Sequence, residues 1–269
     1  MNQFDIILVI VIAIFCGLDV LQETAERRRT LVTRKYPLHA GLFVAGELVQ
    51  FAMPLTVASV SYAATQLGVG LGPYINPLGW PVALAIWMLA LTLVMYFVHW
   101  AEHRYSALWA FHRVHHNDEY LEASTAFRHH PVEDIVSIAA IAVLGFVLNP
   151  PLTVLLGGFL IGISIDLFSH SRLELPAKLS SVLEWVIVTP RQHRVHHSPL
   201  AIQTDSNFGG TFTFWDRLFG TYRLETPAGV GLDDPNFSGD RARDFDTLLF
   251  EPFQFLWRRT RQLPVEPAE

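Results

Sequence analysis

Apolar residues in this chain gather in five blocks, at 6–18, 40–64, 81–98, 135–148 and 152–168. A helix needs about 20 mostly apolar residues to cross the hydrocarbon core of a bilayer. The five blocks therefore compete for a spanning role, and the shorter ones need their flanking residues to reach that length. We expect an all-α, polytopic integral membrane protein with four to five spanning helices.

Two features at the ends of these blocks refine the expectation. The last two blocks are joined by Asn149, Pro150 and Pro151, and prolines there end one helix and start another, which predicts a helical hairpin. The first five residues lack the positive region of a cleaved secretory signal. The first block is thus expected to remain as a membrane helix, with Asp19 near the membrane boundary.

The loop charges predict the orientation of the helices. Five Lys and Arg residues lie at 27–35, after the first block, whereas the segments 68–80 and 149–151 contain none. By the positive-inside rule the first loop is cytoplasmic and the other two are external. The third block and the hairpin then end on the cytoplasmic side. The region from Ser171 onward is expected to form a cytoplasmic helical cap, with a frayed Pro- and Glu-rich tail from Leu263.

The composition agrees with a membrane protein, since 51% of the residues are hydrophobic and only 16% are charged, against about 25% charged in soluble domains. No basic stripe interleaved with aromatic residues is present, which argues against a nucleic-acid partner. Cys16 is the single cysteine. An intrachain disulfide and a multi-cysteine metal site are therefore both excluded.

The spacing of the histidines indicates that this membrane protein binds metal. Three groups read His-x-x-x-His or His-x-x-His-His, and residues three and four apart share one face of a helix. With one more isolated histidine the candidate ligands number nine, which is too many for one ion and suits two. They are His99, His103, His112, His115, His116, His170, His193, His196 and His197. The absence of a Glu-x-x-His pair argues against a carboxylate-bridged di-iron bundle.

The chain resembles the integral-membrane sterol desaturase and fatty acid hydroxylase superfamily over roughly residues 96–223. The resemblance rests on residues 99–104, 108–116, 189–197, 207–210 and 215–221. It implies a non-haem di-iron oxygenase in which these nine histidines hold two irons, with His170 as the isolated family histidine. Some members have a second histidine where this chain has Glu174, which leaves open an oxygen ligand or a vacant position. No catalytic residue is implied beyond the metal ligands.

The implied chemistry is activation of O₂ by the reduced iron pair, followed by hydroxylation or desaturation of an unactivated C–H bond. The substrate would be an apolar lipid that enters from the bilayer: a fatty acyl chain, a sterol-like lipid, an ether lipid or a carotenoid. Residues 124–128 and 215–221 also resemble the alkylglycerol monooxygenase branch. No His-Pro-Gly-Gly haem-domain signature is present, so the electron donor is expected to be a separate cytochrome b5-like or ferredoxin-like protein.

Several residues near the clusters have two interpretations. His129 and His130 are candidates for extra ligands or for hydrogen bonds that orient ligands, and Asn207 and Asp216 for ordering the cap or for ordinary turn and helix-cap roles. Five other residues carry weaker expectations. His39 is expected to be a helix-end or interfacial residue. Glu102 and Asp166 are expected to pair with imidazoles or with arginines, or to serve helix packing. Gly158 with Gly162 is expected to permit close helix packing.

These observations predict three regions: N-terminal membrane helices at 1–80, a hydroxylase-like catalytic domain at 81–223 and a cytoplasmic tail at 224–269. The alternative function is a zinc-binding membrane protein with a structural or hydrolytic role. A metal transporter is disfavoured because the histidines lie at the ends of the predicted spans and not midway along them. Zinc binds imidazole strongly, so it is expected to replace iron in some purified preparations.

Overall fold

A computed structural model describes residues 3–30, 34–50 and 52–262. Those residues form helices and loops without a β-strand, and the nearest approach to a sheet is one isolated antiparallel bridge between Ile187 and Phe212. The all-α prediction is confirmed. The tail from Leu263, which was expected to fray, lies outside the described residues.

By length and composition, four of the described helices are able to cross a membrane. They are α1 (Gln3–Leu21), α6 (Trp80–Arg104), α8 (Pro131–Leu148) and α9 (Leu152–His170). The predicted block at 40–64 falls on two helices of 15 residues each, α3 (Tyr36–Gln50) and α4 (Ala52–Gln66). These two helices lie on either side of residue 51, which is outside the described residues. Among the described residues, the other four predicted blocks are candidate spans.

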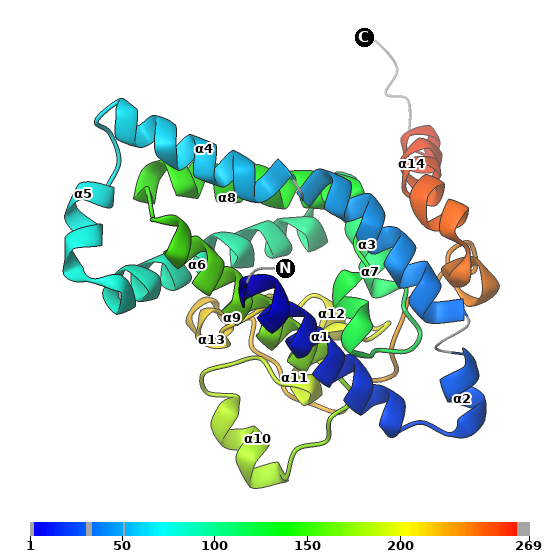
Figure 1. Ribbon diagram of the computed structural model, residues 1–269. Coiled ribbons are helices and arrows are strands. Elements are labelled where there is room, and N and C mark those ends of the chain that lie inside the picture. The colour runs from blue at the N-terminus through cyan, green and yellow to red at the C-terminus, as the bar shows by residue number, and fades with distance from the viewer. Residues whose placement is uncertain (1–2, 31–33, 51, 263–269) are drawn as a thin grey trace.

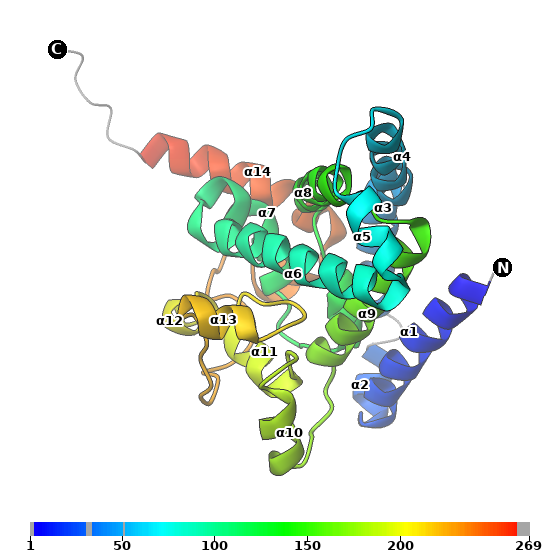
Figure 2. The same cartoon turned by 90° about the vertical axis from the view of Figure 1, so that its left-hand side faces the viewer.

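The long helices pack one against the next (Figures 1 and 2). Both α3 and α4 contact α8, which contacts α6; α6 contacts α9, and α9 contacts α1. Prolines at 150 and 151 and the left-handed backbone of Asn149 (φ 47°) separate α8 from α9. The predicted helix break is therefore confirmed, but α8 and α9 each pack against α6 and do not pair with each other as the expected hairpin.

The remaining elements surround one end of this layer. After α1 comes α2 (Ala25–Thr30), and α5 (Gly72–Ile75) and η2 (Asn76–Leu78) precede α6 at the opposite end. Beyond α6 lie α7 (Ser106–His116) and η3 (Ala123–Phe127). The part after α9 contains α10 (Ala177–Leu183), α11 (Pro190–His196), α12 (Ala201–Thr204), α13 (Phe214–Phe219), η4 (Gly239–Arg243) and α14 (Phe245–Gln262).

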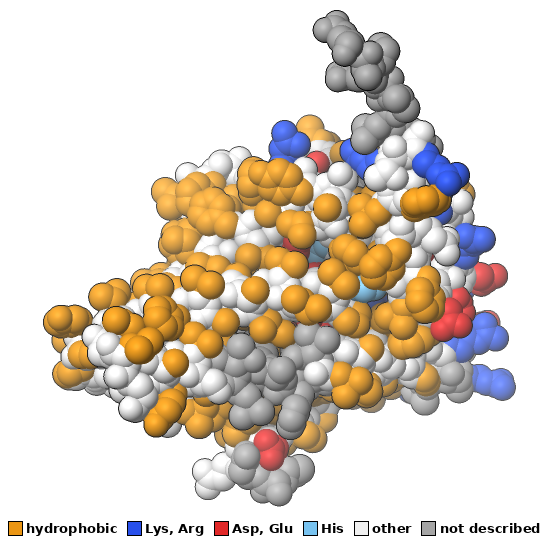
Figure 3. All heavy atoms as spheres, turned by 90° about the horizontal axis from the view of Figure 1, so that it is seen from above, with side chains coloured by type: hydrophobic (Ala, Val, Ile, Leu, Met, Phe, Trp, Pro, Cys, Tyr) orange, Lys and Arg blue, Asp and Glu red, His pale blue; other side chains and the backbone are white. Residues whose placement is uncertain are grey.

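Charge is distributed unevenly along the molecule. In Figure 3, hydrophobic side chains cover the end that carries α4, α5 and the start of α6, while Lys and Arg gather at the opposite end, where α2 and α14 lie. The outer spans present apolar side chains to their surroundings; in α1 only Asp19 is buried. That carboxylate accepts hydrogen bonds from the backbone N–H of Ala123 (2.6 Å) and of Arg172 (2.9 Å). Asp19 thus ties the end of α1 to η3 and to the segment after α9.

Close packing of α6 against α9 depends on Gly158. A Cβ at this position would lie 2.7 Å from two ring atoms of the buried Trp87 and 3.3 Å from Sδ of Met88, whereas a Cβ at Gly162 would meet nothing within 4 Å. The small residue lets the two backbones approach, as at other helix contacts in membranes. Gly158 therefore serves the packing of helices within the chain, as the sequence suggested.

We predict that Gly158→Ala destabilises the protein, because the added methyl group overpacks the α6–α9 contact at a cost of about 1–3 kcal/mol. Thermal unfolding in detergent should show a midpoint lowered by roughly 2–4 °C for each kcal/mol. Gly162→Ala is the matched control and should leave the midpoint equal or slightly raised, since Ala is favoured over Gly within a helix. Equal midpoints for both variants would contradict this account of Gly158.

Candidate metal centre

Nine histidine side chains converge at the end of α6 and α9, where α7 and α11 meet these two helices. Helix α6 continues past its apolar block and presents His99 and His103 in its last two turns, and α9 ends on His170. Three histidines come from α7, two from α11 and one from the residue that ends α11. The prediction that each motif lies on a helix is confirmed.

The imidazoles form two groups that adjoin each other. A five-histidine group contains His99, His103, His112, His116 and His196, and a four-histidine group contains His115, His170, His193 and His197. Within each group the nitrogens that are able to bind a metal lie within 4.8 Å of one another. The rings of His116 and His197 stack with centroids 4.4 Å apart, so the two groups meet along a common border.

The distances between nitrogens suit bound metal ions. In the five-histidine group, Nε2 of His112 lies 3.1 Å from Nε2 of His99 and 3.1 Å from Nε2 of His116. In the four-histidine group, successive Nε2 atoms are 3.1, 2.9 and 3.1 Å apart along His115, His170, His193 and His197. With a metal–imidazole bond of about 2.0–2.1 Å, two ligands at a right angle have nitrogens about 2.8–3.0 Å apart. The spacing fits that requirement.

Hydrogen bonds on the outer side of the rings explain why Nε2 points inward. Nδ1 of His99 lies 2.8 Å from the carbonyl oxygen of Phe208, Nδ1 of His196 lies 2.7 Å from that of Ser206, and Nδ1 of His170 lies 2.8 Å from that of Asp166. A carbonyl oxygen only accepts, so each of these Nδ1 atoms carries the proton and Nε2 keeps its lone pair. Lone pairs that face each other at such distances repel unless a cation lies between them.

Burial keeps the imidazoles neutral, which metal binding also requires. Loss of solvent lowers the pKa of His196 to about 3, and burial together with neighbouring imidazoles holds the pKa of four other histidines well below the usual value. These four are His115, His116, His193 and His197. A group of neutral imidazoles with inward lone pairs fits divalent metal ions better than it fits an ordinary protein core.

Carboxylates lie behind the five-histidine group. Nδ1 of His112 is 2.9 Å from Oε1 of Glu133 and 3.6 Å from Oε2 of Glu102, and both acids are buried. Nδ1 of His103 lies 3.3 Å from Oδ1 of Asp205, whose side chain is 60% exposed. Such partners fix the ring orientation and make the imidazole a stronger ligand. In the four-histidine group the carboxylate contact is that of His170 with Oδ1 of Asp166, at 3.1 Å.

The loop at 205–209 supports α6 through a short relay. Asp216, buried in α13, accepts hydrogen bonds from the backbone N–H of Phe208 (2.7 Å) and of Gly209 (3.0 Å), and the carbonyl of Phe208 then faces His99. A Cβ on Gly209 would lie 2.4 Å from the carbonyl oxygen of Phe212, so only glycine fits there. Burial raises the pKa of Asp216 to about 6.

Asn207 has a related role in the same loop. Its left-handed backbone (φ 55°) turns the chain, and its side chain bonds both Gln192 and the backbone of Arg223. Through Gln192 it holds α11, which presents His193. Asn207 and Asp216 therefore act on the histidines through the loop and lie outside both histidine groups.

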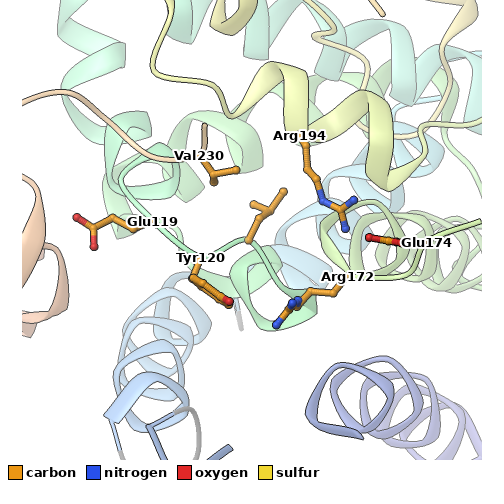
Figure 4. A pocket seen from close by; sticks show the side chains of 7 residues that line it. Glu119, Tyr120, Arg172, Glu174, Arg194 and Val230 are labelled. Atoms are coloured by element: carbon orange, nitrogen blue, oxygen red, sulfur yellow. The ribbon is translucent and has the colours of Figure 1, made fainter. Parts of the chain in front are cut away.

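The remaining predicted residues also lie outside the two groups. The ring of His129 is 4.9 Å from that of His115, and its Nδ1 lies 3.9 Å from Asp134. His130 caps α8, since its Nδ1 accepts a hydrogen bond from the N–H of Val132. Glu174 lines a pocket beside Arg194 (Figure 4). His39 lies in the first turn of α3, in line with the expected helix-end position, and its buried side chain bonds Ser124 through Nδ1 (2.7 Å).

Sequence comparison identifies the family. A model of the family described as fatty acid hydroxylase matches residues 84–221, or 138 of the 269 residues. The chain belongs to the fatty acid hydroxylase family. The match contains all nine clustered histidines, and with the relatives below it makes this member of the fatty acid hydroxylase family an oxidoreductase of the hydroxylase and monooxygenase class.

The similar proteins with described activities modify lipids. The chain is 27% identical over 257 residues to the ornithine lipid hydroxylase OlsE of Rhizobium tropici, which covers 91% of this chain and 73% of that protein. It is 32% identical over 189 residues to the alkylglycerol monooxygenase of Danio rerio, which covers 68% of this chain but 40% of that protein. The human alkylglycerol monooxygenase is 29% identical over 164 residues, or 35% of its length. No solved structure is significantly similar to this chain.

Two supporting residues had no signal in the sequence. Glu133 stands in the first turn of α8, where acidic residues are common for reasons of helix stability alone, and Asp205 follows the short helix α12. Their distance from the histidines along the chain hides the contact. Glu102 and Asp166 were considered as imidazole partners, and the structure places both beside one.

We predict that Glu133→Gln weakens metal binding by about 10–100-fold, the usual effect of removing a partner of a ligand histidine. Metal retained after dialysis against graded chelator, measured by mass spectrometry, checks this. Asp205→Asn is the matched control, and its effect should be smaller because Asp205 is 60% exposed. A larger loss in Asp205→Asn than in Glu133→Gln would contradict the predicted order.

We also predict that the metal-free protein loses stability as the pH falls below about 6.5, the usual pKa of histidine in an unfolded chain. In the unfolded state the five histidines then bind protons. In the folded state they do not, because burial lowers their pKa, to about 3 for His196. His129 opposes this with one proton: burial lowers its pKa, but Glu133, Asp134 and Asp166 outweigh burial and raise it.

The measurement is the unfolding midpoint of chelator-treated protein between pH 7.5 and 5. It should fall steadily toward pH 5, and added metal should shift the fall to lower pH because metal binds the folded state. A midpoint that does not change between pH 7 and 5 would show that these histidines are already protonated or accessible in the folded protein.

Proposed function

We propose that this protein is an O₂-dependent hydroxylase of a membrane lipid and that its nine clustered histidines hold two iron ions. The observation that carries the proposal is the pair of adjoining imidazole groups, with Nε2 atoms 2.9–3.1 Å apart, at the end of candidate membrane spans. We further propose residues 81–223 as the catalytic unit. The family match at 84–221 supports that boundary.

The chain supplies position and electrostatics for this chemistry. When bound, the iron ions would supply O₂ activation for attack on an unactivated C–H bond. Glu133 and Asp205 orient His112 and His103, the loop at 205–209 orients His99 and His196, and burial keeps water from the imidazoles. A set of ligands held this firmly favours one arrangement of the metals.

The overall reaction requires an electron donor. Insertion of one oxygen atom of O₂ into a C–H bond gives an alcohol and water, and it consumes two electrons and two protons. We propose a separate cytochrome b5-like or ferredoxin-like protein as the source. The basic end of the molecule, with α2 and α14 (Figure 3), lies on the side that the positive-inside rule makes cytoplasmic, which supports a cytoplasmic active site.

The relatives favour hydroxylation over desaturation and narrow the substrate. One is named for ornithine lipid and others for alkylglycerols, and both are membrane lipids. We therefore propose a glycerol ether lipid or an aminoacyl lipid ahead of sterols and carotenoids. A zinc protein with a structural or hydrolytic role is not favoured by these relatives.

The experiment that tests the function is anaerobic purification with ⁵⁷Fe, followed by Mössbauer spectroscopy and metal analysis of the same sample. We predict about two irons per chain, as the two histidine groups require, and a signal that changes when reduced protein meets O₂. Incubation with ¹⁸O₂, a chemical reductant and bilayer lipids should give a lipid heavier by one ¹⁸O atom.

His193→Ala should abolish the product and lower the iron content, because His193 links the four-histidine group to α11. Glu225→Gln is the control, since Glu225 is exposed and pairs with Arg223 outside the histidine groups. Protein that contains zinc, gains no iron on anaerobic reconstitution and gives no labelled product would favour the zinc alternative.

A further inference from the structure

A polar pocket of about 320 Å³ lies outside the two histidine groups but on the same elements. Arg194, between His193 and His196 in α11, forms part of its lining, together with Arg172, two residues after His170. Tyr120, Glu119 and Glu174 complete its polar wall (Figure 4). The pocket is therefore a neighbour of the four-histidine group.

Two of the charged residues in this wall are already engaged. Arg172 forms an ion pair with Glu23, and its guanidinium lies 5.2 Å from the ring centre of Tyr120. Glu119 pairs with Arg243 at 3.1 Å and accepts a hydrogen bond from the backbone N–H of Gly239, and it points away from the pocket in Figure 4.

Arg194 and Glu174 are different, because their charges face the pocket without a close partner. Nη2 of Arg194 donates to the carbonyl oxygen of Ser171 at 3.1 Å, and in the described part of the chain neither residue forms an ion pair. The two side chains point into the same space (Figure 4). Burial lowers the pKa of Arg194 while Glu174 opposes this, so the two charges interact without being in contact.

The ends of the spans place the pocket at the level of the lipid headgroups. Helix α1 ends at Leu21 and α9 at His170, and Glu23 and Arg172, which follow them, pair beside the pocket. Arg27 and Lys35 lie 4.4 and 5.5 Å from the ring centre of Tyr120. Basic residues and tyrosine collect where a span leaves the bilayer, so the pocket opens at the membrane surface.

We propose that this pocket binds the zwitterionic headgroup of the lipid substrate, with a carboxylate or phosphate on Arg194 and an ammonium group on Glu174. The inference rests on the proposed function, which makes a membrane lipid the substrate. Arg194 is half-buried, so an anionic partner offsets its loss of solvent, while Glu174 is exposed beside it. An arginine fork suits carboxylate and phosphate equally.

This assignment separates the two substrate classes that the relatives suggest. An aminoacyl lipid that carries one carboxylate and one ammonium group satisfies both residues, and so does a phosphoethanolamine lipid. An alkylglycerol offers only neutral hydroxyl groups. It would leave the Arg194 and Glu174 charges without ionic partners, so the pocket favours a zwitterionic lipid over an alkylglycerol.

The test is lipid binding to the full-length, metal-loaded protein in nanodiscs, followed by native mass spectrometry. Four probes are compared: ornithine lipid, phosphatidylethanolamine, anionic phosphatidylglycerol and neutral alkylglycerol. The first two should bind roughly tenfold or more tightly than the neutral lipid, a typical effect of charge-assisted hydrogen bonds. The ratio between ornithine lipid and phosphatidylethanolamine then identifies carboxylate or phosphate as the preferred anion.

Two variants test separately the residue that binds the ammonium group and the residue that binds the anionic group. Glu174→Gln should remove the preference for the zwitterionic lipids over phosphatidylglycerol, and Arg194→Gln should remove the preference for all charged lipids over alkylglycerol. Arg223→Gln is the matched control, because the Arg223 side chain pairs with Glu225 away from the pocket. Metal content and unfolding midpoint, measured on each variant, show that it is folded and loaded.

Equal binding of all four lipids by the unmodified protein would overturn the inference, as would an equal loss in Arg223→Gln. The ¹⁸O₂ experiment is independent of this result. A labelled product without headgroup preference would overturn the pocket assignment and support the hydroxylase proposal. Headgroup preference with no labelled product from iron-loaded protein would support the pocket assignment and overturn the hydroxylase proposal.

Discussion

Repulsion between inward-facing imidazole lone pairs is the constraint on which the rest of this structure depends. Nε2 of His99 and Nε2 of His112 lie 3.1 Å apart. Their Nδ1 atoms face the carbonyl of Phe208 and the carboxylate of Glu133, so both Nε2 atoms keep lone pairs that repel until a cation lies between them. Burial intensifies the problem, because protonation would bring positive charges together in a region with little water. Metal binding resolves the repulsion, so folding of this end of the protein and occupation by metal are expected to be coupled. The surrounding packing then holds the imidazoles in an arrangement that they would not adopt by themselves.

The membrane helices provide the rigidity that such an arrangement needs. Helix α6 runs from Trp80 to Arg104 and continues beyond its apolar block, so that its last two turns carry His99 and His103 out of the hydrophobic layer. Helix α9 does the same with His170 at its final residue. The contact at Gly158 sets how closely these two helices approach, and through them it sets the distance between ligands of the two groups. In lipid, close packing at small residues replaces the hydrophobic driving force of a soluble core. A packing change far from the histidines is therefore expected to reach the metal site.

Much of this architecture was open to prediction because the signals are local. Histidines three and four residues apart must share a helix face, and Asn149 with its two prolines must break a helix, whatever surrounds them. Helix packing shows the limit of that reasoning, because hydropathy does not reveal that α8 and α9 both pack against α6. The partners of the ligands were equally hidden: the carbonyl of Phe208 carries no side-chain signature, and Glu133 resembles any acidic residue in a first helical turn. The sequence places His39 at a helix end or an interface, but it does not reveal the hydrogen bond to Ser124, which lies 85 residues away along the chain. The features that the sequence does not reveal are thus the contacts between residues far apart along the chain.

The pocket beside the four-histidine group gives Glu174 a role other than metal binding. Glu174 occupies a position where some related sequences have a histidine, and from the sequence the natural question was whether its carboxylate replaces a metal ligand. The structure gives it a different neighbour, since it lies with Arg194 in the polar pocket. Arg194 in turn belongs to the same helix as His193, so a single turn of α11 presents one side chain to the four-histidine group and another to the polar pocket. Recognition of the polar end of a lipid and reaction on the lipid would then share one rigid element, which limits how far the reacting carbon atoms can move relative to the metals.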